Sequence, residues 1–484
     1  MAEPAKHVQK IHDHFKTEEA RRSLKELTEL GIGAGAAPSD TGTSLKNEKS
    51  LAQEIDERLA ALDREIGTQL DEVLHLPEFQ ALESAWRSLD SLVKKCDFKK
   101  ARLAIVQITK EELRQDFAGR LPHDSNWFEW IYNGGMGQFG GIPVGTVVGN
   151  FAFQNTAADI GLLKNLAADS AMAHAPFIDS VSPDFFGWND WNELATAGKE
   201  LPQQIETSNF FTKWRSLRKD ENARYLALTL PRVLRRLPYD PDDNPADGLK
   251  YYKESHLQHD NYLWGNASFA YAGCMLESFS ESGWPSNIIG PQSGGAVKDL
   301  PIHRYETTAG FSLKVPTEVK IKNNTELMLS EEGFNALTWR ENSDEAVFFS
   351  DSTVLKPKQF DDKHTQANFE LSTKLTYMSL MNRLTHYLKV EQMEHLGSWK
   401  SAQELENYLT NLTKKWINTA ANPKAEDRDK YPFKMINVTV VKNLEHVGWY
   451  DVTIEATPHL KYMGADFTLT LTDSRENPAE SRGG

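Results

Sequence analysis

The residues that first suggest chemistry are the glycines of the stretch GGMGQFGGIPVGTVVGNF, residues 134–151. Gly135, Gly137 and Gly140 form a literal G-x-G-x-x-G, the spacing found in many dinucleotide-binding turns. Such a turn works when a strand leads into it and a helix leaves it, because the helix N-terminus faces the pyrophosphate. Here WFEWIYN (127–133) has the pattern of a helix end, and a β-branched strand pattern follows the glycines. The sequence therefore predicts a glycine turn into a buried strand, with no cofactor.

Two histidines and an aspartate offer a second kind of chemistry. On a helix, His256, His259 and Asp260 would place two imidazoles and a carboxylate close together, a donor set that suits a metal ion. The chain has 14 histidines, so this spacing also arises by chance, and a solvated or capping role explains the same residues. No P-loop, H-E-x-x-H or G-x-S-x-G occurs. A soluble metal-dependent enzyme built on these three residues is kept as the alternative function.

Composition and charge narrow the class of protein. The 484 residues carry a net charge of −15, which disfavours a nucleic-acid binder. The densest basic cluster, Arg232, Arg235 and Arg236, is short and is more typical of an ion-paired face. The two cysteines, Cys96 and Cys274, indicate neither a disulfide framework nor a cysteine zinc site. No signal peptide or membrane-spanning run is apparent, so we expect a water-soluble protein of a reducing compartment.

The pattern of elements indicates a mixed α/β (α+β) fold. Helices are expected over 51–74 and 78–93, broken at Pro77 and packed as an α-hairpin. Strands are expected over 101–108, buried, and over 142–153. The C-terminal part has helical patterns over 368–395 and 401–419. It ends in three alternating strand candidates, FKMINVTVVKN, GWYDVTIEA and ADFTLTLTD.

Five blocks of sequence together resemble one family. They are LDREIGTQLDEVLHLPEFQALESAWRSLDSLV; FGGIPVGTVVGNFAF with DIGLLKNLAADSAMAHAPFI; RYLALTLPRVLRRLPYDPDDNP with YLWGNASFAYAGCMLESFSESGWPSNIIGPQSGGAVKDLP; NRLTHYLKVEQMEHLGSW; and GWYDVTIEATPHL. In this order, and covering roughly residues 60–475, they resemble the large sheath subunit of the contractile type VI secretion system, the TssC/VipB (also ImpC/EvpB) family. The first fifty residues match no block of this kind.

The resemblance implies a structural protein without catalytic activity. Such subunits pair with a small sheath partner of the TssB/VipA type and stack with further copies of themselves as a helical tube. The tube surrounds an inner tube of Hcp-type hexamers, assembles on a baseplate and contracts to drive the inner tube into a target cell. A ClpV-type AAA+ ATPase then disassembles it, which agrees with the lack of a P-loop here. The implied location is the bacterial cytoplasm, and no membrane insertion is expected. A baseplate or adaptor protein is a third possibility, to be distinguished by small closed oligomers in place of tubes.

The implied fold is a contractile-tail sheath fold with an N-terminal helical arm and a C-terminal β-strand extension. The expected organisation is an arm and linker over 1–55, a sheath core over 56–367, and C-terminal helices with terminal strands over 368–484. In the family, terminal extensions supply strands to neighbouring subunits. The candidates here are the arm over 31–50 and two terminal strands, 450–456 and 466–472, with these residues: Val452, Ile454, Phe467, Leu469 and Leu471.

The N-terminal segment 7–30 has apolar residues at helical spacing, and a small-residue linker follows it. A narrow stripe on a short helix cannot bury itself alone, so it must dock on its own body or on a partner. In some members of the family the ATPase recognises a short N-terminal helix. SLKELTEL fits that character through Ser23, Leu24, Leu27 and Leu30, and an ordinary packing helix fits it equally well.

Overall fold

The computed structural model describes residues 51–197, 200–256, 258–308, 310–394, 401–420, 423–443, 449–459 and 469–476. The chain divides into two units, Met1–Leu59 and Ala60–Gly484. Helix α2 (Leu51–Leu74) begins in the first unit, and the other described elements belong to the second. The expected arm over 31–50 and the candidate recognition helix with Ser23, Leu24, Leu27 and Leu30 lie outside the described residues, as does Phe467.

A mixed six-stranded sheet forms the centre of the second unit, in the order β1-β2-β3-β9-β10-β6. The strands are β1 (Val147–Val148), β2 (Phe177–Ser180), β3 (Leu226–Leu230), β9 (Phe334–Trp339), β10 (Ala346–Phe348) and β6 (Ala296–Val297). The first four strands run parallel to one another, and β10 and β6 add two antiparallel neighbours. Helices separate most of the parallel strands in sequence, as crossover connections require. The sequence-based assignment to a mixed α/β fold is confirmed.

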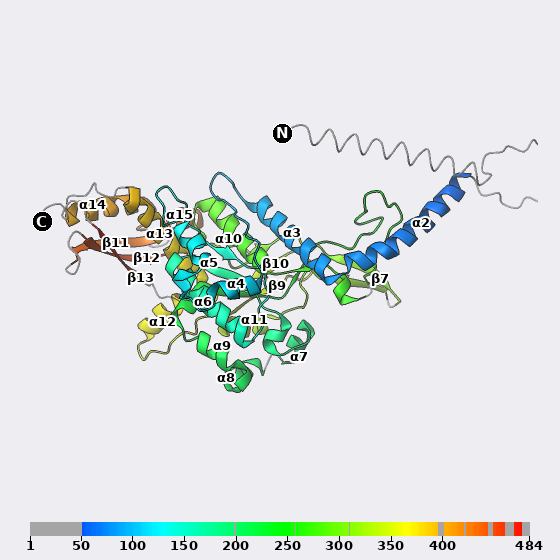
Figure 1. Ribbon diagram of the computed structural model, residues 1–484, viewed down its shortest axis with the longest axis horizontal. Coiled ribbons are helices and arrows are strands. Elements are labelled where there is room, and N and C mark those ends of the chain that lie inside the picture. Colours follow the sequence, from blue (N-terminus) through cyan, green and yellow to red (C-terminus); the bar gives the residue numbers. More distant parts are fainter. Residues whose placement is uncertain are drawn as a thin grey trace, which may run out of the picture. The chain divides into compact units, whose positions relative to one another are not determined.

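Both faces of this sheet are covered. Along β3, Leu226, Leu228 and Leu230 belong to one apolar core together with residues of α6 (Ala157–Ala173), whereas Ala227 belongs to the core formed with α10 (Ser268–Ser282). This alternation is that of a strand with helices on both sides. In Figure 1, α6 and α10 can be followed on either side of the strands labelled β9 and β10.

The C-terminal part is built around a second apolar cluster, to which Trp284 also contributes. Helix α12 (Lys363–Leu371) stops before α13 (Leu375–Glu394), so the single helix expected over 368–395 is two. Helix α13 and α14 (Ala402–Thr413) share an apolar cluster with β11 (Phe433–Lys442) and β12 (Trp449–Pro458). With β13 (Leu469–Glu476), these strands form an antiparallel meander in the order β11-β12-β13. The three predicted terminal strands are thus confirmed, because period-2 patterns of this length specify a strand strongly.

Helices α2 and α3 (Pro77–Lys95) meet at Pro77, as predicted, but they do not form the expected packed hairpin. The apolar stripe of α3 faces solvent: Leu82 is 56% exposed and Trp86 is 62% exposed. Its buried face carries Ser84, Ser88 and Leu92, and it lies alongside α10 (Figure 1). Small polar side chains allow the two helices to approach closely. A prediction based on the spacing of apolar residues does not identify such a face as buried.

The prediction of a buried strand over 101–108 is wrong. This segment belongs to no strand, and Ile105 is 67% exposed and Val106 38% exposed. It runs into the capping box of α4, where Thr109 accepts a hydrogen bond from the backbone N–H of Glu112. Short apolar runs carry strand propensity but do not show what covers them.

Shorter elements complete the described chain. The helices are α4 (Lys110–Phe117), α5 (Asn126–Phe128), α7 (Leu194–Ala197), α8 (Leu201–Thr207), α9 (Thr212–Leu217), α11 (Asn323–Glu331) and α15 (Ala425–Lys430). Two small ribbons are β4 (Val233–Leu234) with β5 (Trp264–Gly265), and β7 (His303–Thr307) with β8 (Gly310–Lys314). Single turns at Pro122–Asp124, Pro183–Phe186, Trp191–Glu193, Asn209–Phe211, Glu221–Tyr225, His259–Asn261 and Lys414–Trp416 are 3₁₀, and Glu129–Asn133 is a π-helical turn.

Candidate functional site

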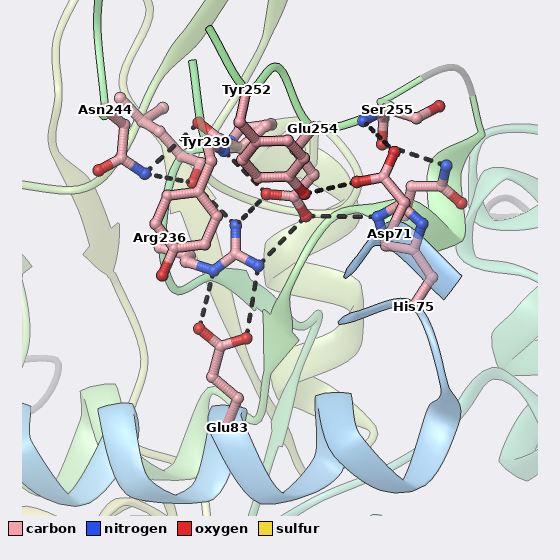
Figure 2. A network of polar contacts seen from close by, with 12 residues as sticks. Asp71, His75, Glu83, Arg236, Tyr239, Asn244, Tyr252, Glu254 and Ser255 are labelled. Carbon is pink, nitrogen blue, oxygen red and sulfur yellow. Dashed lines mark hydrogen bonds and ion pairs between the residues drawn. The ribbon is translucent and has the colours of Figure 1, made fainter. Parts of the chain in front are cut away.

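The most developed polar site lies under α2 and α3, around Arg236. Its guanidinium contacts two carboxylates: Nε lies 2.8 Å from Glu83 Oε1 of α3, and Nη1 lies 2.6 Å from Glu254 Oε2. Figure 2 shows the guanidinium between these two acids, with Glu83 reaching it from the helix. The side chain of Arg236 is 7% exposed and that of Glu254 is 1% exposed. A buried cation is thereby matched by two anions.

The second acid, Glu254, gathers further partners. Its Oε2 accepts a hydrogen bond from the backbone N–H of Tyr239, and its Oε1 lies 3.3 Å from His75 Nε2. Beside it, Asp71 of α2 accepts hydrogen bonds from the Tyr252 hydroxyl (2.5 Å) and the Ser255 backbone (3.1 Å). Figure 2 shows these groups as one continuous network. The loop over 239–255 is therefore fastened to α2 directly and to α3 through Arg236.

Local sequence explains why these groups converge. Arg236 lies two residues after the short strand β4, which pairs with β5. On α2, Gly67 leaves room for the Tyr252 ring, since a Cβ at Gly67 would lie 2.6 Å from Tyr252 Cδ2. Asp63, one turn earlier, accepts a 2.8 Å hydrogen bond from the Tyr251 backbone. Each turn of α2 in this region thus presents a small or acidic residue inward.

The contacts around Arg236 favour the charged forms of Arg236 and Glu83. Burial by itself lowers the pKa of Arg236, but its hydrogen bonds with Glu254 and Glu83 outweigh burial and hold that pKa above its usual value. For Glu83, burial raises the pKa, and the contacts with Arg236 and Arg87 reverse this and lower it. These two pKa shifts move both groups away from the range in which a general acid or base works near neutral pH. What this site can do is join two helices to a sheet core so that they move together.

The predicted metal residues do not converge. His256 packs edge-on against His303, with ring centroids 4.6 Å apart. His259 instead lies 3.0 Å from Glu318 and 2.8 Å from Lys314 Nζ, in a 3₁₀ turn and not on the expected helix. Within the described ranges, no group of three or more histidine, cysteine, aspartate or glutamate side chains could hold a metal ion. The geometry thus lends no support to the alternative metal enzyme.

The glycine motif follows the end of a helix, as the sequence predicts, but the buried strand expected over 142–153 is reduced to the two half-buried residues of β1. A short helix ending in the π-helical turn Glu129–Asn133 precedes it, and β1 follows it. Close backbone packing requires glycine at two positions: a Cβ at Gly141 would lie 2.0 Å from the carbonyl oxygen of Gly135, and one at Gly135 would lie 2.7 Å from that of Ile142. Gly140 has open space around it and a left-handed φ of +74°. The loop lies against the end of α13 and, together with Lys389 and Met393, lines a shallow depression.

The terminal-strand candidates lie in the C-terminal meander. Val452 and Ile454 are on β12, and their side chains are 2% and 6% exposed. This strand is paired on both sides within the chain, with β11 and with β13. Leu469 and Leu471 are on β13, which has no partner among the described residues on its outer edge. Exchange between subunits therefore stays a prediction, and its available edge is that of β13.

Other sequence candidates have ordinary structural roles. Arg232 pairs with Glu318 through two contacts, and Arg236 belongs to the network above, so the arginine cluster is mainly ion-paired as expected. Arg235 donates to the Asn266 carbonyl oxygen. Both cysteines are free thiols. No helix of the described part of the chain is long and apolar enough to cross a membrane.

The sequence did not point to the Arg236 network. Glu83 and Arg236 are 153 residues apart, and Glu254 lies 18 residues beyond Arg236. The one feature of the sequence that could have indicated the network is Glu83, which lies on α3 beside the small residues Ser84 and Ser88. Small residues beside a charge indicate close packing of a partner, but they do not name it.

Comparison with known proteins identifies the class. Two family models match the chain: the EvpB/VC_A0108 tail sheath N-terminal domain (VipB) over residues 56–355, and the EvpB/VC_A0108 tail sheath gpW/gp25-like domain over residues 364–474. The chain is also 32% identical over 473 residues to the type VI secretion system sheath protein TssC1 of Pseudomonas aeruginosa, covering 96% of this chain and 94% of that one. It is thus a structural sheath protein of a contractile secretion system. More particularly, the chain belongs to the TssC/VipB family of type VI secretion sheath proteins.

Solved structures show weaker likeness. The helical sheath of the anti-feeding prophage in its contracted state is 13% identical, with a TM-score of 0.32 and coverage of 69% of this chain and 66% of that one. The sheath tail protein Lin1278 from Listeria innocua is 12% identical, with a TM-score of 0.31 and coverage of 65% and 59%.

Proposed function

We propose that this chain, together with a small sheath partner and further copies of itself, builds a helical tube around an inner tube of hexameric rings. The tube assembles extended on a baseplate in the bacterial cytoplasm and contracts to propel the inner tube into a target cell. A helical tube needs heterologous contacts, in which one surface of a copy meets a different surface of the next. Contraction changes the angle between copies, so some contacts must survive rigid-body rotation.

The outer edge of β13 is the observation that carries this proposal. The meander β11-β12-β13 is anchored on one side, where Glu406 of α14 accepts a 3.0 Å hydrogen bond from the Val440 backbone on β11. No described residue pairs with the other side, so β13 offers main-chain donors and acceptors to another strand. A strand added there is held by backbone hydrogen bonds that tolerate rotation of the bodies on either side.

The proposed organisation assigns a role to each part. Residues 1–55 act as an arm and linker, 56–367 as the sheath core, and 368–484 as the region that exchanges strands. An arm strand of a neighbour, the counterpart of 31–50, is the proposed occupant of the β13 edge. The chain carries no catalytic activity in this proposal, and ATP is hydrolysed by an AAA+ disassembly ATPase. That ATPase is proposed to recognise the segment with Ser23, Leu24, Leu27 and Leu30.

Co-expression with the small sheath partner, followed by negative-stain microscopy, tests the proposal. We expect hollow helical tubes from the intact chain. A chain ending at His459 lacks β13 and should keep its thermal midpoint for the core while forming no tubes. A chain ending at Glu476 retains β13 and is the matched control, which should still form tubes.

Two results would contradict different parts of this proposal. Tubes that persist in the chain ending at His459 overturn the strand-edge assignment and leave the sheath assignment standing. Small closed oligomers, or monomers only, from the intact chain and its partner overturn the tube itself.

A further inference from the structure

The cluster of three arginines around β4 contains one cation without an anion. Two of its members, Arg232 and Arg236, are paired with glutamates. Arg235 forms no ion pair with any described residue: its Nη2 donates a 2.6 Å hydrogen bond to the Asn266 carbonyl oxygen, and its Nε is buried without an acceptor. Burial lowers the pKa of Arg235 to about 10, and no described carboxylate is near enough to counteract this. A guanidinium withdrawn from water is costly unless an anion accompanies it.

The N-terminus of α10 lies beside this cation and adds a second positive feature. Its N-cap residue, Ala267, offers no side-chain acceptor, and the first turn contains no acid. The backbone N–H groups of Phe269 and Ala270 have no acceptor among the described residues. The carbonyl oxygen of Asn266, four residues before Ala270, accepts from Arg235. Unpaired N–H groups and the helix dipole both favour a negative charge at this end of the helix.

Both features lie at the carboxyl ends of the parallel strands. Ser268, the first residue of α10, donates its backbone N–H to Ser180 Oγ at the end of β2 and its hydroxyl to the Gly149 carbonyl oxygen just after β1. The next residue, Asn150, is exposed, and its Oδ1 accepts a 2.8 Å hydrogen bond from Asn266 Nδ2. In open α/β sheets, ligands bind at this edge, outside the carboxyl ends of the strands. Since Asn150 is exposed, solvent reaches this edge.

The surroundings of Arg235 hold its side chain in place. A Cβ at Gly265 would lie 2.4 Å from Arg235 Nε and 2.8 Å from its Cγ, so glycine at this position lets the side chain lie directly against β5. The hydroxyl oxygen of Ser84 on α3 lies 2.8 Å from the same point. Arg235 is therefore enclosed between β5 and α3. A donor fixed in this way loses little conformational entropy when it binds an acceptor.

We infer that Arg235 and the first turn of α10 bind a phosphate-type oxyanion, either free phosphate or the phosphate group of a small ester. Its donors are the unpaired N–H groups of the guanidinium and the backbone N–H groups of Phe269 and Ala270. A tetrahedral oxyanion offers acceptors in several directions, so it can meet a guanidinium and a helix N-terminus together. The inference concerns a small ligand of this chain, and it is independent of the proposed assembly of sheath subunits.

Calorimetric titration of inorganic phosphate into the full-length chain, at pH 7 and constant ionic strength, tests the inference. We expect saturable binding of one phosphate per chain. Arg235→Gln removes the cation and should weaken the affinity roughly tenfold or more. Asn150→Asp should weaken it by a similar factor, because aspartate still accepts the hydrogen bond from Asn266 but places a negative charge beside the anion. Asn150 is exposed, so this second variant is expected to fold normally.

Asn411→Asp is the matched control for charge. Asn411 is exposed on α14 and its Oδ1 accepts a hydrogen bond from Lys414, so the substitution adds the same charge and likewise keeps an acceptor. It should leave the phosphate affinity unchanged. Phenyl phosphate, titrated in parallel, distinguishes the two sources of the oxyanion. Tighter binding than inorganic phosphate assigns the site to an ester, and equal or weaker binding assigns it to free phosphate.

Asn150→Asp also gives a readout without added ligand. Its carboxylate would supply the missing anion, so the thermal midpoint in chloride buffer should be higher than that of the parent chain, and phosphate should raise it by less. The inference is overturned if neither probe binds saturably. It is also overturned if Arg235→Gln and Asn150→Asp both leave the affinity unchanged, which would show an adventitious ion only.

Discussion

Glu83 and Arg236 lie 153 residues apart in the chain and 2.8 Å apart in space, and this pair joins α3 to the segment that follows β4. Arg236 is 7% exposed and Glu83 is 14% exposed, so water does little to screen them. The pair is placed where a pull on the outer helices would reach the core.

Removal of the cation should destabilise this region strongly. In Arg236→Leu, Glu83 and Glu254 would remain buried without their partner, a situation that costs roughly 3–5 kcal/mol. We expect a lower thermal midpoint and faster hydrogen exchange across residues 77–95. The exposed pair Arg340–Glu345, with side chains 63% and 23% exposed, provides the control. Arg340→Leu should change stability by less than about 0.5 kcal/mol. Equal effects of the two substitutions would show that the Arg236 network contributes no more to stability than an exposed ion pair.

Acid should weaken the junction between α6 and α13 through His174. Burial, with contributions from Lys389 and His386, lowers the pKa of His174 to about 3. The unfolded chain binds a proton near pH 6.5 that the folded chain refuses, so this group reduces stability as pH falls from about 6.5 towards 3. His174 has φ +52°, which asparagine tolerates well.

His174→Asn should therefore lessen the loss of stability between pH 7 and pH 4.5 by roughly 2 kcal/mol. Guanidinium unfolding at the two pH values measures it. The control is His123→Asn, since the side chain of His123 is 51% exposed. A pH dependence that is the same in both variants would contradict the assignment to His174.

Asp179 should give the opposite pH dependence, because it should reduce stability as pH rises. It is fully buried at the end of β2, and burial raises its pKa to about 7 in spite of hydrogen bonds from the Ser180 and Phe151 backbone. The folded chain therefore keeps a proton that the unfolded chain releases near pH 4, and stability falls as pH rises from about 4 through 7.

Asp179→Asn removes that titration. Relative to the parent chain, the variant should gain roughly 2 kcal/mol of stability on going from pH 5 to pH 8. Thermal midpoints over this range test it, with exposed Asp361→Asn as the control. A constant difference between variant and parent across the range would show that Asp179 does not titrate there.

The sequence predicts some features of this fold well and others not at all. The meander β11-β12-β13 follows from alternation, because one face of each strand had to be buried. The stripe through Leu82 and Trp86 correctly indicates a helix, yet periodicity does not show what covers an apolar face, and here no described part of the chain covers it. The Arg236 network depends on contacts between distant segments of ordinary composition, which no local pattern contains.

The glycine loop offers the sharpest test of close packing. A methyl group at Gly141 would lie 2.0 Å from the carbonyl oxygen of Gly135, so the backbone would have to move. Because this loop also contacts the end of α13 near Met393, the shift should reach the C-terminal part. Overpacking of this kind costs about 1–3 kcal/mol, so Gly141→Ala should lower the thermal midpoint.

Gly161→Ala is the matched control, because Gly161 is exposed within α6 and nothing lies within 4 Å of its added Cβ. Alanine there should stabilise the helix by about 0.5–1 kcal/mol, since it restricts the unfolded chain without a clash. The two substitutions are chemically identical and should therefore move the midpoint in opposite directions. If both substitutions raise the thermal midpoint, the loop can accommodate a Cβ at Gly141 in spite of its close backbone contacts. Glycine at this position would then not be required by packing.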